Sequence, residues 1–416
     1  LKYGVPPKIV RLLIGMHRHV LVKFDIDGVV KMLEAILGVK QGDLLGPPLF
    51  DFYIAAIMET WRVTSTYELP LFRTRPDFQM TGRRPTTSGE DFTVGDSEYA
   101  DDTGLAFCSR ADVDEQTPLV MAHFRRWGME IHAGVLDPLV GSGLLDFSAM
   151  TPLKGSKSEV LFCSKPLHMY TDPETFDGAD LSPILLPNDR FMEIVDRFPY
   201  LGDVVARDGG DALAVDARVE AGSKAFGTLR GCLFSSTSVS REAKRAVYEA
   251  IVMSIALYGC ECWSLTEPLY RRLRVMQAQH FRAMSRVTRM HAWEHHISTQ
   301  QLGRELGIPS IDHLIARRQL RWAGHISRMD YDHRLPRRML SSWVPHSRPV
   351  GGPAMTYGRS LGKALDHFLL DRERWPELAA NRAAWRAMLR AGFAPPEFRP
   401  RPPSPPPRPP PSWLLP

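Results

Sequence analysis

The sequence predicts an α+β chain in which a sheet-forming part precedes a helical part. Up to about residue 205, short runs of alternating apolar residues are separated by turn residues, which is typical of strands and hairpins. From about Ala212 onward, apolar residues recur at helical spacing. With 416 residues, of which 44% are hydrophobic, the chain can form about two or three packed domains.

The first predicted elements are a helix, a hairpin and a second helix. Apolar residues from Ile9 to Met16 follow a Pro-marked turn at helical spacing. The run VLVKFDIDGVV then alternates, and its Asp27-Gly28 belongs to the strongest class of hairpin dipeptide. Beyond Pro47-Pro48 a helix is expected. Its apolar face comprises Leu49, Phe50, Tyr53, Ile54 and Ile57.

Two adjacent aspartates, Asp101 and Asp102, stand between Tyr99-Ala100 and an apolar strand-like run. Neighbouring carboxylates repel each other, so such a pair is tolerated where it is solvated, capped or neutralised by cations. A tight hairpin with both acids at its tip suits Mg²⁺, which takes one or two carboxylates and completes its shell with water and phosphates. An exposed acidic turn is the alternative interpretation.

The rest of the first half is predicted from patterns of the same kind. A Gly-, Pro- and Asp-rich connection leads to the aspartate hairpin, and a helix covers Val113 to Trp127. A strand begins at Lys157, and Pro166 to Asp189 is expected to be an inserted loop. RFPYLGDVVARDG predicts one more hairpin-like pair of strands.

The second half is predicted to be helical. One helix starts at the cap Ser240 and ends at Gly259, with a repeat of Val247, Ile251, Ile255 and Tyr258. A second helix is capped by Thr266, and its inward face comprises Leu269, Leu273, Met276, His280 and Met284. A third spans SIDHLIARRQLRWAGHISRM, and a last one covers ELAANRAAWRAMLRAG. The Pro-rich tail is expected to stay solvated or to bind a Pro-recognising domain.

Charge is distributed unevenly along the chain. The net charge is +5, yet residues 218–345 hold 20 Lys and Arg against 10 Asp and Glu. A basic part of this size is compatible with binding a polyanion, although many helical surfaces are also basic.

Neither a disulfide framework nor a zinc site is predicted. The five cysteines show no repeated C-x-x-C spacing. The Cys and His residues of the second half fit no standard ligand pattern. They are Cys260, Cys262, His280, His291, His295 and His296.

No run approaches 18 uninterrupted apolar residues, and the amino end shows neither a starting Met nor the apolar region of a signal peptide. We therefore expect a soluble, intracellular chain without membrane partners that is a fragment of a longer protein.

Four motifs in fixed order, GVKQGDLLGPPLF, EYADDTGLAF, KSEVLF and FPYLGDVVARDG, resemble those of reverse transcriptases of non-LTR (LINE-like) retrotransposons. LYGCECWSLTEPLYRRLRVMQAQHFRAM, RRQLRWAGHISRM and WPELAANRAAW look like the segment that follows the catalytic domain in such polymerases. The resemblance implies a right-hand polymerase fold, with a partial fingers and palm region followed by a mostly helical thumb-like region. It also implies an RNA template, a DNA primer or target, dNTPs and a nuclear location.

The resemblance assigns roles to individual residues. Asp101 and Asp102 match the aspartates that hold two catalytic Mg²⁺ ions, which Mn²⁺ could replace. Tyr99 would pack beside the primer end. Gln41 and Gly42 match the motif against which the template base and nucleotide stack, or they form an ordinary helix-entry turn.

Further residues would contact the nucleotide and the duplex. Lys157 matches a lysine near the nucleotide phosphates, or it is a solvated strand-edge lysine. Tyr200, Leu201 and Gly202 resemble the hairpin that grips the primer. A set of arginines would contact duplex phosphates or simply face solvent. These are Arg271, Arg272, Arg274, Arg317, Arg318 and Arg321.

The chain departs from the family pattern in one important respect. The family requires a third aspartate on a strand before the first helix, and we expect that strand to lie upstream of Leu1. Asp25 and Asp27 do not replace it, because they follow that helix and Asp27-Gly28 is explained as a turn. We therefore expect the chain to polymerise little or not at all by itself. A non-catalytic nucleic-acid-binding remnant and a poorly folded relic are the alternatives.

The predicted domains follow from these motifs. Residues 1–205 form the partial fingers and palm, 206–345 the helical thumb or connection region, 346–396 a small helical extension, and 397–416 the disordered Pro-rich tail.

Overall fold

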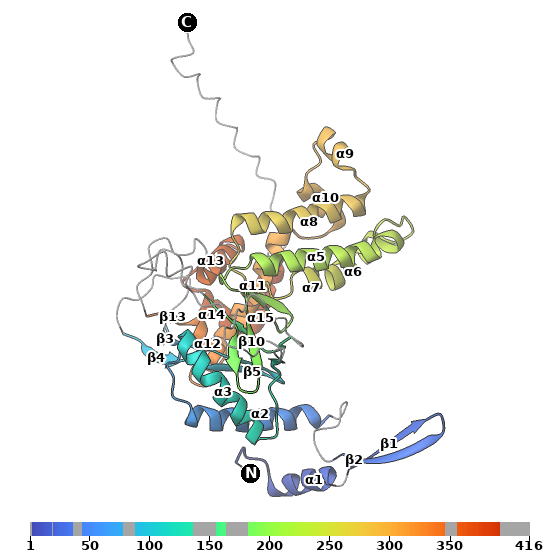
Figure 1. Cartoon of the computed structure of the whole chain (residues 1–416). Coiled ribbons are helices and arrows are strands. Elements are labelled where there is room, and N and C mark those ends of the chain that lie inside the picture. The colour runs from blue at the N-terminus through green and yellow to red at the C-terminus, as the bar shows by residue number, and fades with distance from the viewer. Residues whose placement is uncertain are drawn as a thin grey trace. The chain divides into compact units, whose positions relative to one another are not determined.

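The computed structural model describes residues 2–18, 20–35, 44–77, 88–135, 155–163, 182–345 and 356–391. The chain divides into two compact units: Leu1–Leu69 with Gly95–Ile131, and Pro70–Val94 with His132–Pro416. The predicted mixture of helices and strands is confirmed, and helices prevail after residue 206 (Figure 1). The domain boundaries after residues 205, 345 and 396 stay predictions. Gln41, Gly42 and the Pro-rich tail lie outside the described residues.

The first unit contains the predicted helices and hairpins. Its elements are α1 (Pro7–His17), β1 (Val20–Ile26), β2 (Val29–Ala35), α2 (Gly46–Thr64), β5 (Asp96–Tyr99), β6 (Asp102–Leu105) and α3 (Arg110–Arg126). Asp27 and Gly28 turn the β1–β2 hairpin with φ values of 52° and 83°, as the dipeptide predicts. α3 begins before the predicted Val113 because the Ser109 hydroxyl accepts a hydrogen bond from the amide of Asp112 and caps the helix.

The core of the first unit lies between α2 and α3. It comprises Ile54, Ile57, Met58, Trp61, Val120 and Phe124. The predicted apolar face of α2 is confirmed at Ile54 and Ile57, which are buried. Tyr53 on the same face is 37% exposed and packs the edge of its ring against Trp127.

In its described part, the second unit contains three small sheets. Their strands are β3 (Leu71–Thr74), β4 (Glu90–Thr93), β7 (Gly134–Val135), β8 (Glu159–Leu161), β9 (Ile184–Leu186), β10 (Arg190–Val195), β11 (Arg197–Tyr200), β12 (Asp203–Ala206) and β13 (Ser342–Trp343). β10 pairs antiparallel with β7 and β9 and parallel with β8. β3 pairs antiparallel with β4 and β13, and β11 with β12 form the predicted hairpin.

Two predictions about connecting segments are wrong. The loop predicted for Pro166–Asp189 contains β9, in which Ile184 is fully buried. The connection predicted before the aspartate hairpin contains β3 and β4. These strands are too short to show a clear alternation of apolar residues, and β3 takes one partner, β13, from a distant part of the sequence. Such pairing leaves no local pattern to detect.

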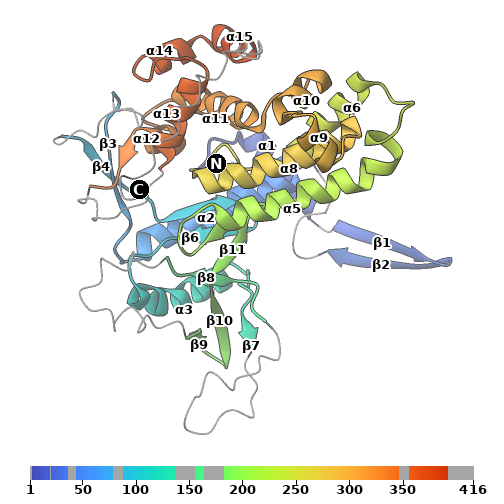
Figure 2. The same cartoon turned by 90° about the horizontal axis from the view of Figure 1, so that it is seen from above.

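Most of the second unit is helical. Its helices are α5 (Ala212–Leu229), the π-helix η4 (Arg230–Phe234), α6 (Arg241–Val247), the π-helix η5 (Tyr248–Val252), α7 (Met253–Ala256), α8 (Glu267–Ser285), α9 (Arg289–Glu294), α10 (Thr299–Leu306), α11 (Ile311–Ser327), α12 (Leu335–Leu340), α13 (Tyr357–His367), α14 (Trp375–Ala380) and α15 (Arg382–Ala391). α5 and α8 run side by side (Figure 2). The predicted inward face of α8 is confirmed, because all five of its residues are buried.

The apolar repeat predicted for the helix after Ser240 matches the buried face only in part, because Val247 packs partly buried against a hydrophobic core but later positions do not. Ile251 and Tyr258 are exposed, whereas Tyr248 and Val252 are fully buried. The π-helical segment η5 explains the difference. A π-turn holds more residues than an α-turn, so it shifts the buried face relative to a regular helical repeat. The predicted cap is confirmed, since the Ser240 hydroxyl accepts a hydrogen bond from the amide of Ala243.

The last predicted helix is two helices. Asn381 separates α14 from α15, and its side-chain oxygen accepts hydrogen bonds from the amides of Ala383 and Ala384. This capping arrangement starts a new helix where the apolar spacing suggests continuity. α11, α13, α14 and α15 enclose a second core around Leu320, Leu365 and Trp385. None of the helices in the described ranges is long and apolar enough to span a membrane.

Candidate metal and nucleic-acid site

The adjacent aspartates lie at the tip of the hairpin formed by β5 and β6. Tyr99 stands opposite Asp102, and Ala100 and Asp101 make the turn. Both aspartates are exposed, and Tyr99 is 65% exposed. Ala100 has a φ of 52°, a left-handed conformation that costs an L-residue roughly 1–2 kcal/mol. The first central residue of a two-residue hairpin turn takes a positive φ, as Asp27 and Leu201 do at two other hairpin tips, so this conformation turns the chain sharply and leaves both carboxylates at the tip.

The base of the hairpin is fixed by Arg62 on α2. Its guanidinium lies 2.6 Å from the carboxylate of Asp96 and 2.7 Å from that of Glu98. The carboxylates of Asp101 and Asp102, by contrast, contact no basic side chain among the residues with described positions. The hairpin therefore presents two uncompensated carboxylates, the ligand type that hard cations prefer.

No third ligand joins these two aspartates in the described part of the chain. Among the described residues, three potential metal ligands do come together elsewhere in the chain. They are His291, Glu294 and His295. Two-metal catalysis requires carboxylates from more than one strand. His291 and His295 are among the Cys and His residues for which no zinc site is predicted, and Glu294 is not among the candidate ligands. The His-x-x-Glu-His spacing, which places all three on one helical face, was the usable signal.

Lys157, predicted to lie near the nucleotide phosphates, belongs to the second unit, where it is exposed and precedes β8. Its backbone amide donates a hydrogen bond to Nδ1 of His132 at 3.1 Å. The role predicted for Lys157 at the nucleotide phosphates stays a prediction.

The predicted primer-binding hairpin is anchored to the helical region. Leu201 and Gly202 turn the β11–β12 hairpin with φ values of 49° and 80°. The Tyr258 hydroxyl donates a hydrogen bond to the Leu201 carbonyl at 2.8 Å. Arg218 places its guanidinium 4.6 Å from the centre of the Tyr258 ring and 3.9 Å from the Asp203 carboxylate. Tyr258, with Arg218 of α5 against its ring, thus anchors the tip that contains Tyr200, Leu201 and Gly202.

Two of the predicted arginines line an open groove between α5 and α8. The groove has a volume of about 790 Å³, and Arg271, Arg272, Asp216 and Gln279 are among its lining residues. Arg272 is neutralised by both carboxylate oxygens of Asp216, each at 2.7 Å. Arg271 is exposed and forms no ion pair with any residue in the described ranges.

The other four predicted arginines differ in what they contact. Arg274 is bound by Asp312 and Glu267. Arg318 donates hydrogen bonds to the carbonyls of Leu257 and Met253, so it links α11 to the end of α7. Arg317 is half-buried, and burial lowers the pKa of its guanidinium. Arg321 is exposed. Among the six predicted arginines, Arg271 and Arg321 are thus the ones that are exposed without an ion pair to another residue of the described ranges.

Comparison with known proteins places the chain near a transposon product. It is similar to a putative uncharacterized transposon-derived protein of Caenorhabditis elegans, with 24% identity over 204 residues. These residues cover 48% of this chain and 72% of the relative. No family model matches the chain, and no solved structure matches it. The similarity indicates an origin in a transposon.

Proposed function

We propose that the chain derives from the reverse transcriptase of a non-LTR retrotransposon and that the β5–β6 hairpin is the metal-binding hairpin of an RNA-directed DNA polymerase. The observation that carries the proposal is the tip of the β5–β6 hairpin, which exposes two uncompensated carboxylates at Asp101 and Asp102. The similarity to a transposon-derived protein supports the same origin. A polymerase of this class works on a genomic target and so in the nucleus.

Asp101 and Asp102 would hold the Mg²⁺ or Mn²⁺ ions. When bound, these ions activate the primer 3′-hydroxyl and stabilise the pyrophosphate that leaves from the incoming dNTP. Tyr99, next to the aspartates, offers an exposed ring to the primer end. Lys157 would supply a positive charge to the phosphates. The proposal includes a right-hand polymerase palm as the fold around these residues.

The helical part of the second unit would hold the RNA–DNA duplex. Arg271 and Arg321 are exposed on the region with ten surplus positive charges. Contacts from such arginines to phosphates are independent of base sequence. Tyr200, Leu201 and Gly202 form a hairpin tip that is held by Tyr258 and could position the primer strand.

Primer extension tests the catalytic part of the proposal. The purified wild-type chain is supplied with an RNA template, a DNA primer, dNTPs and Mg²⁺. The variants Asp101→Asn and Asp27→Asn are assayed in the same way, and Asp27→Asn, at the β1–β2 turn, is the control. We expect extension near background, because no third carboxylate joins the pair in the described residues. Robust extension that Asp101→Asn abolishes and Asp27→Asn preserves would confirm the polymerase origin but refute the need for a further carboxylate.

A nucleic-acid-binding protein without catalysis is the second candidate, favoured by the basic surplus and by exposed Arg271. Fluorescence anisotropy with an RNA–DNA duplex over a NaCl series tests duplex binding. We expect affinity to fall steeply with salt and to survive Asp101→Asn/Asp102→Asn. Arg271→Ala should reduce by about one the slope of the logarithm of the binding constant against the logarithm of the salt concentration. Arg372→Ala, which removes a partner of Asp366, is the control and should leave this slope unchanged. Absence of binding at low salt would contradict both candidates.

A further inference from the structure

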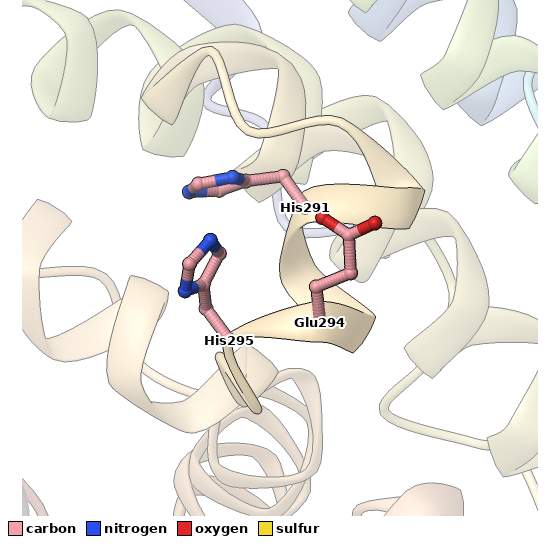
Figure 3. Close-up of side chains that lie close together, drawn as sticks. All are labelled: His291, Glu294 and His295. Carbon is pink, nitrogen blue, oxygen red and sulfur yellow. The ribbon is translucent and has the colours of Figure 1, made fainter.

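Three potential metal ligands meet on the short helix α9, outside the candidate polymerase site. Figure 3 shows the imidazoles of His291 and His295 facing each other, with Glu294 on the same helical turn. One ligand atom from each of the three residues lies within 4.8 Å of the others. The two imidazole rings have centroids 4.2 Å apart. All three side chains are exposed and therefore accessible to an ion in solution.

The local sequence produces this arrangement. Thr288 caps α9, because its hydroxyl accepts a hydrogen bond from the amide of His291 at 3.1 Å. The amide of His295 donates to the carbonyl of His291 at 3.0 Å. Residues separated by three and four positions lie on one face of a helix, so the helical turn itself brings the two imidazoles and the carboxylate together.

α9 is short and exposed. It has six residues, and none of them is buried. A helix this short is marginal in water without tertiary packing. Val287 before it and Ile297 after it pack against a hydrophobic core that includes Leu273 and Phe281 of α8, so both ends of the segment are anchored while the helix between them is not covered.

We propose that His291, Glu294 and His295 bind a Zn²⁺ ion that stabilises α9. Two imidazole nitrogens and a carboxylate oxygen form a ligand set that suits Zn²⁺, with a fourth position left for water. Mg²⁺ prefers oxygen ligands, so this site differs in metal preference from the aspartate pair at the β5–β6 tip. Binding to the folded state alone would raise the stability of the chain.

Calorimetric titration of the metal-free full chain with ZnCl₂ tests the site. We expect one equivalent to bind, with the affinity reduced about tenfold or more by His291→Ala and by His295→Ala. His325→Ala, which removes an exposed histidine of α11, is the matched control and should bind as the wild type does. Asp101→Asn/Asp102→Asn should also retain Zn²⁺ binding. The test of the α9 site is therefore independent of the proposed metal site at the β5–β6 tip.

Co²⁺ absorption supplies a second measurement on the same variants. Tetrahedral coordination gives d–d bands, which should appear with the wild type and be lost in His291→Ala/His295→Ala. Because all the substituted side chains are exposed, circular dichroism should show each variant folded. Equal Zn²⁺ affinity in the wild type and the double variant, or no binding by the wild type, would overturn the proposal.

Discussion

His280 is a buried histidine that the fold holds neutral. Its Nδ1 lies 3.1 Å from the Tyr248 hydroxyl, and the ring of Phe226 stacks on the imidazole at 4.1 Å. Burial lowers the pKa of His280 to about 4. Burial, followed by the neighbouring His367, also lowers the pKa of His313 to about 4.

We expect the free energy of unfolding to fall as the pH decreases from 6.5 to 4. In this window the unfolded chain binds protons at these histidines and the folded chain does not, so acid favours unfolding. For His280 the loss between pH 7 and pH 5 is about 2 kcal/mol. Urea unfolding across this range should show a weaker pH dependence for His280→Gln than for the wild type. His325→Gln, at an exposed position, should keep the full dependence, and equal slopes for all three proteins would contradict the explanation.

At the scale of elements, α5 contains two glycines in different surroundings. A Cβ atom on Gly222 would lie 2.6 Å from the Cβ of Ala256 on α7. On Gly227 it would meet nothing within 4 Å. Gly222 therefore permits the close packing of α5 on α7, whereas Gly227 lowers helix stability without a packing benefit.

Alanine at these two positions should have opposite effects. Gly222→Ala is expected to destabilise the chain by about 1–3 kcal/mol through overpacking. Gly227→Ala is expected to stabilise it by roughly 0.5–1 kcal/mol through helix propensity. Urea denaturation of both variants measures the difference, and a stability of Gly222→Ala equal to that of Gly227→Ala would show that the α5–α7 contact is not tight.

The sequence patterns predicted correctly those elements that form a regular α-helix or a hairpin with a two-residue turn. The inward face of α8 and the Asp27-Gly28 and Leu201-Gly202 turns are such cases. The patterns failed where the structure departs from regular geometry. The π-turns of η5 shift the buried face, and the cap at Asn381 interrupts an otherwise continuous apolar repeat.

At the scale of the whole molecule, the residues with predicted roles belong to two compact units. Asp101 and Asp102 belong to the first unit, whereas Lys157 and the arginines predicted to contact a duplex belong to the second. The sequence motifs could identify the aspartate hairpin because its turn is local. They could not tell exposed Arg271 from Arg274, which two acids neutralise, because Asp312 comes from another helix.

Binding of Mn²⁺ tests most directly whether the Asp101–Asp102 turn is a metal site or an ordinary acidic turn. Water-proton relaxation is measured during titration of the full chain, with His291→Ala/His295→Ala present in every protein to remove the other candidate site. We predict that Asp101→Asn/Asp102→Asn loses about one equivalent of bound Mn²⁺ and that Asp27→Asn, at the turn of the β1–β2 hairpin, loses none. Identical titrations for all three proteins would contradict it.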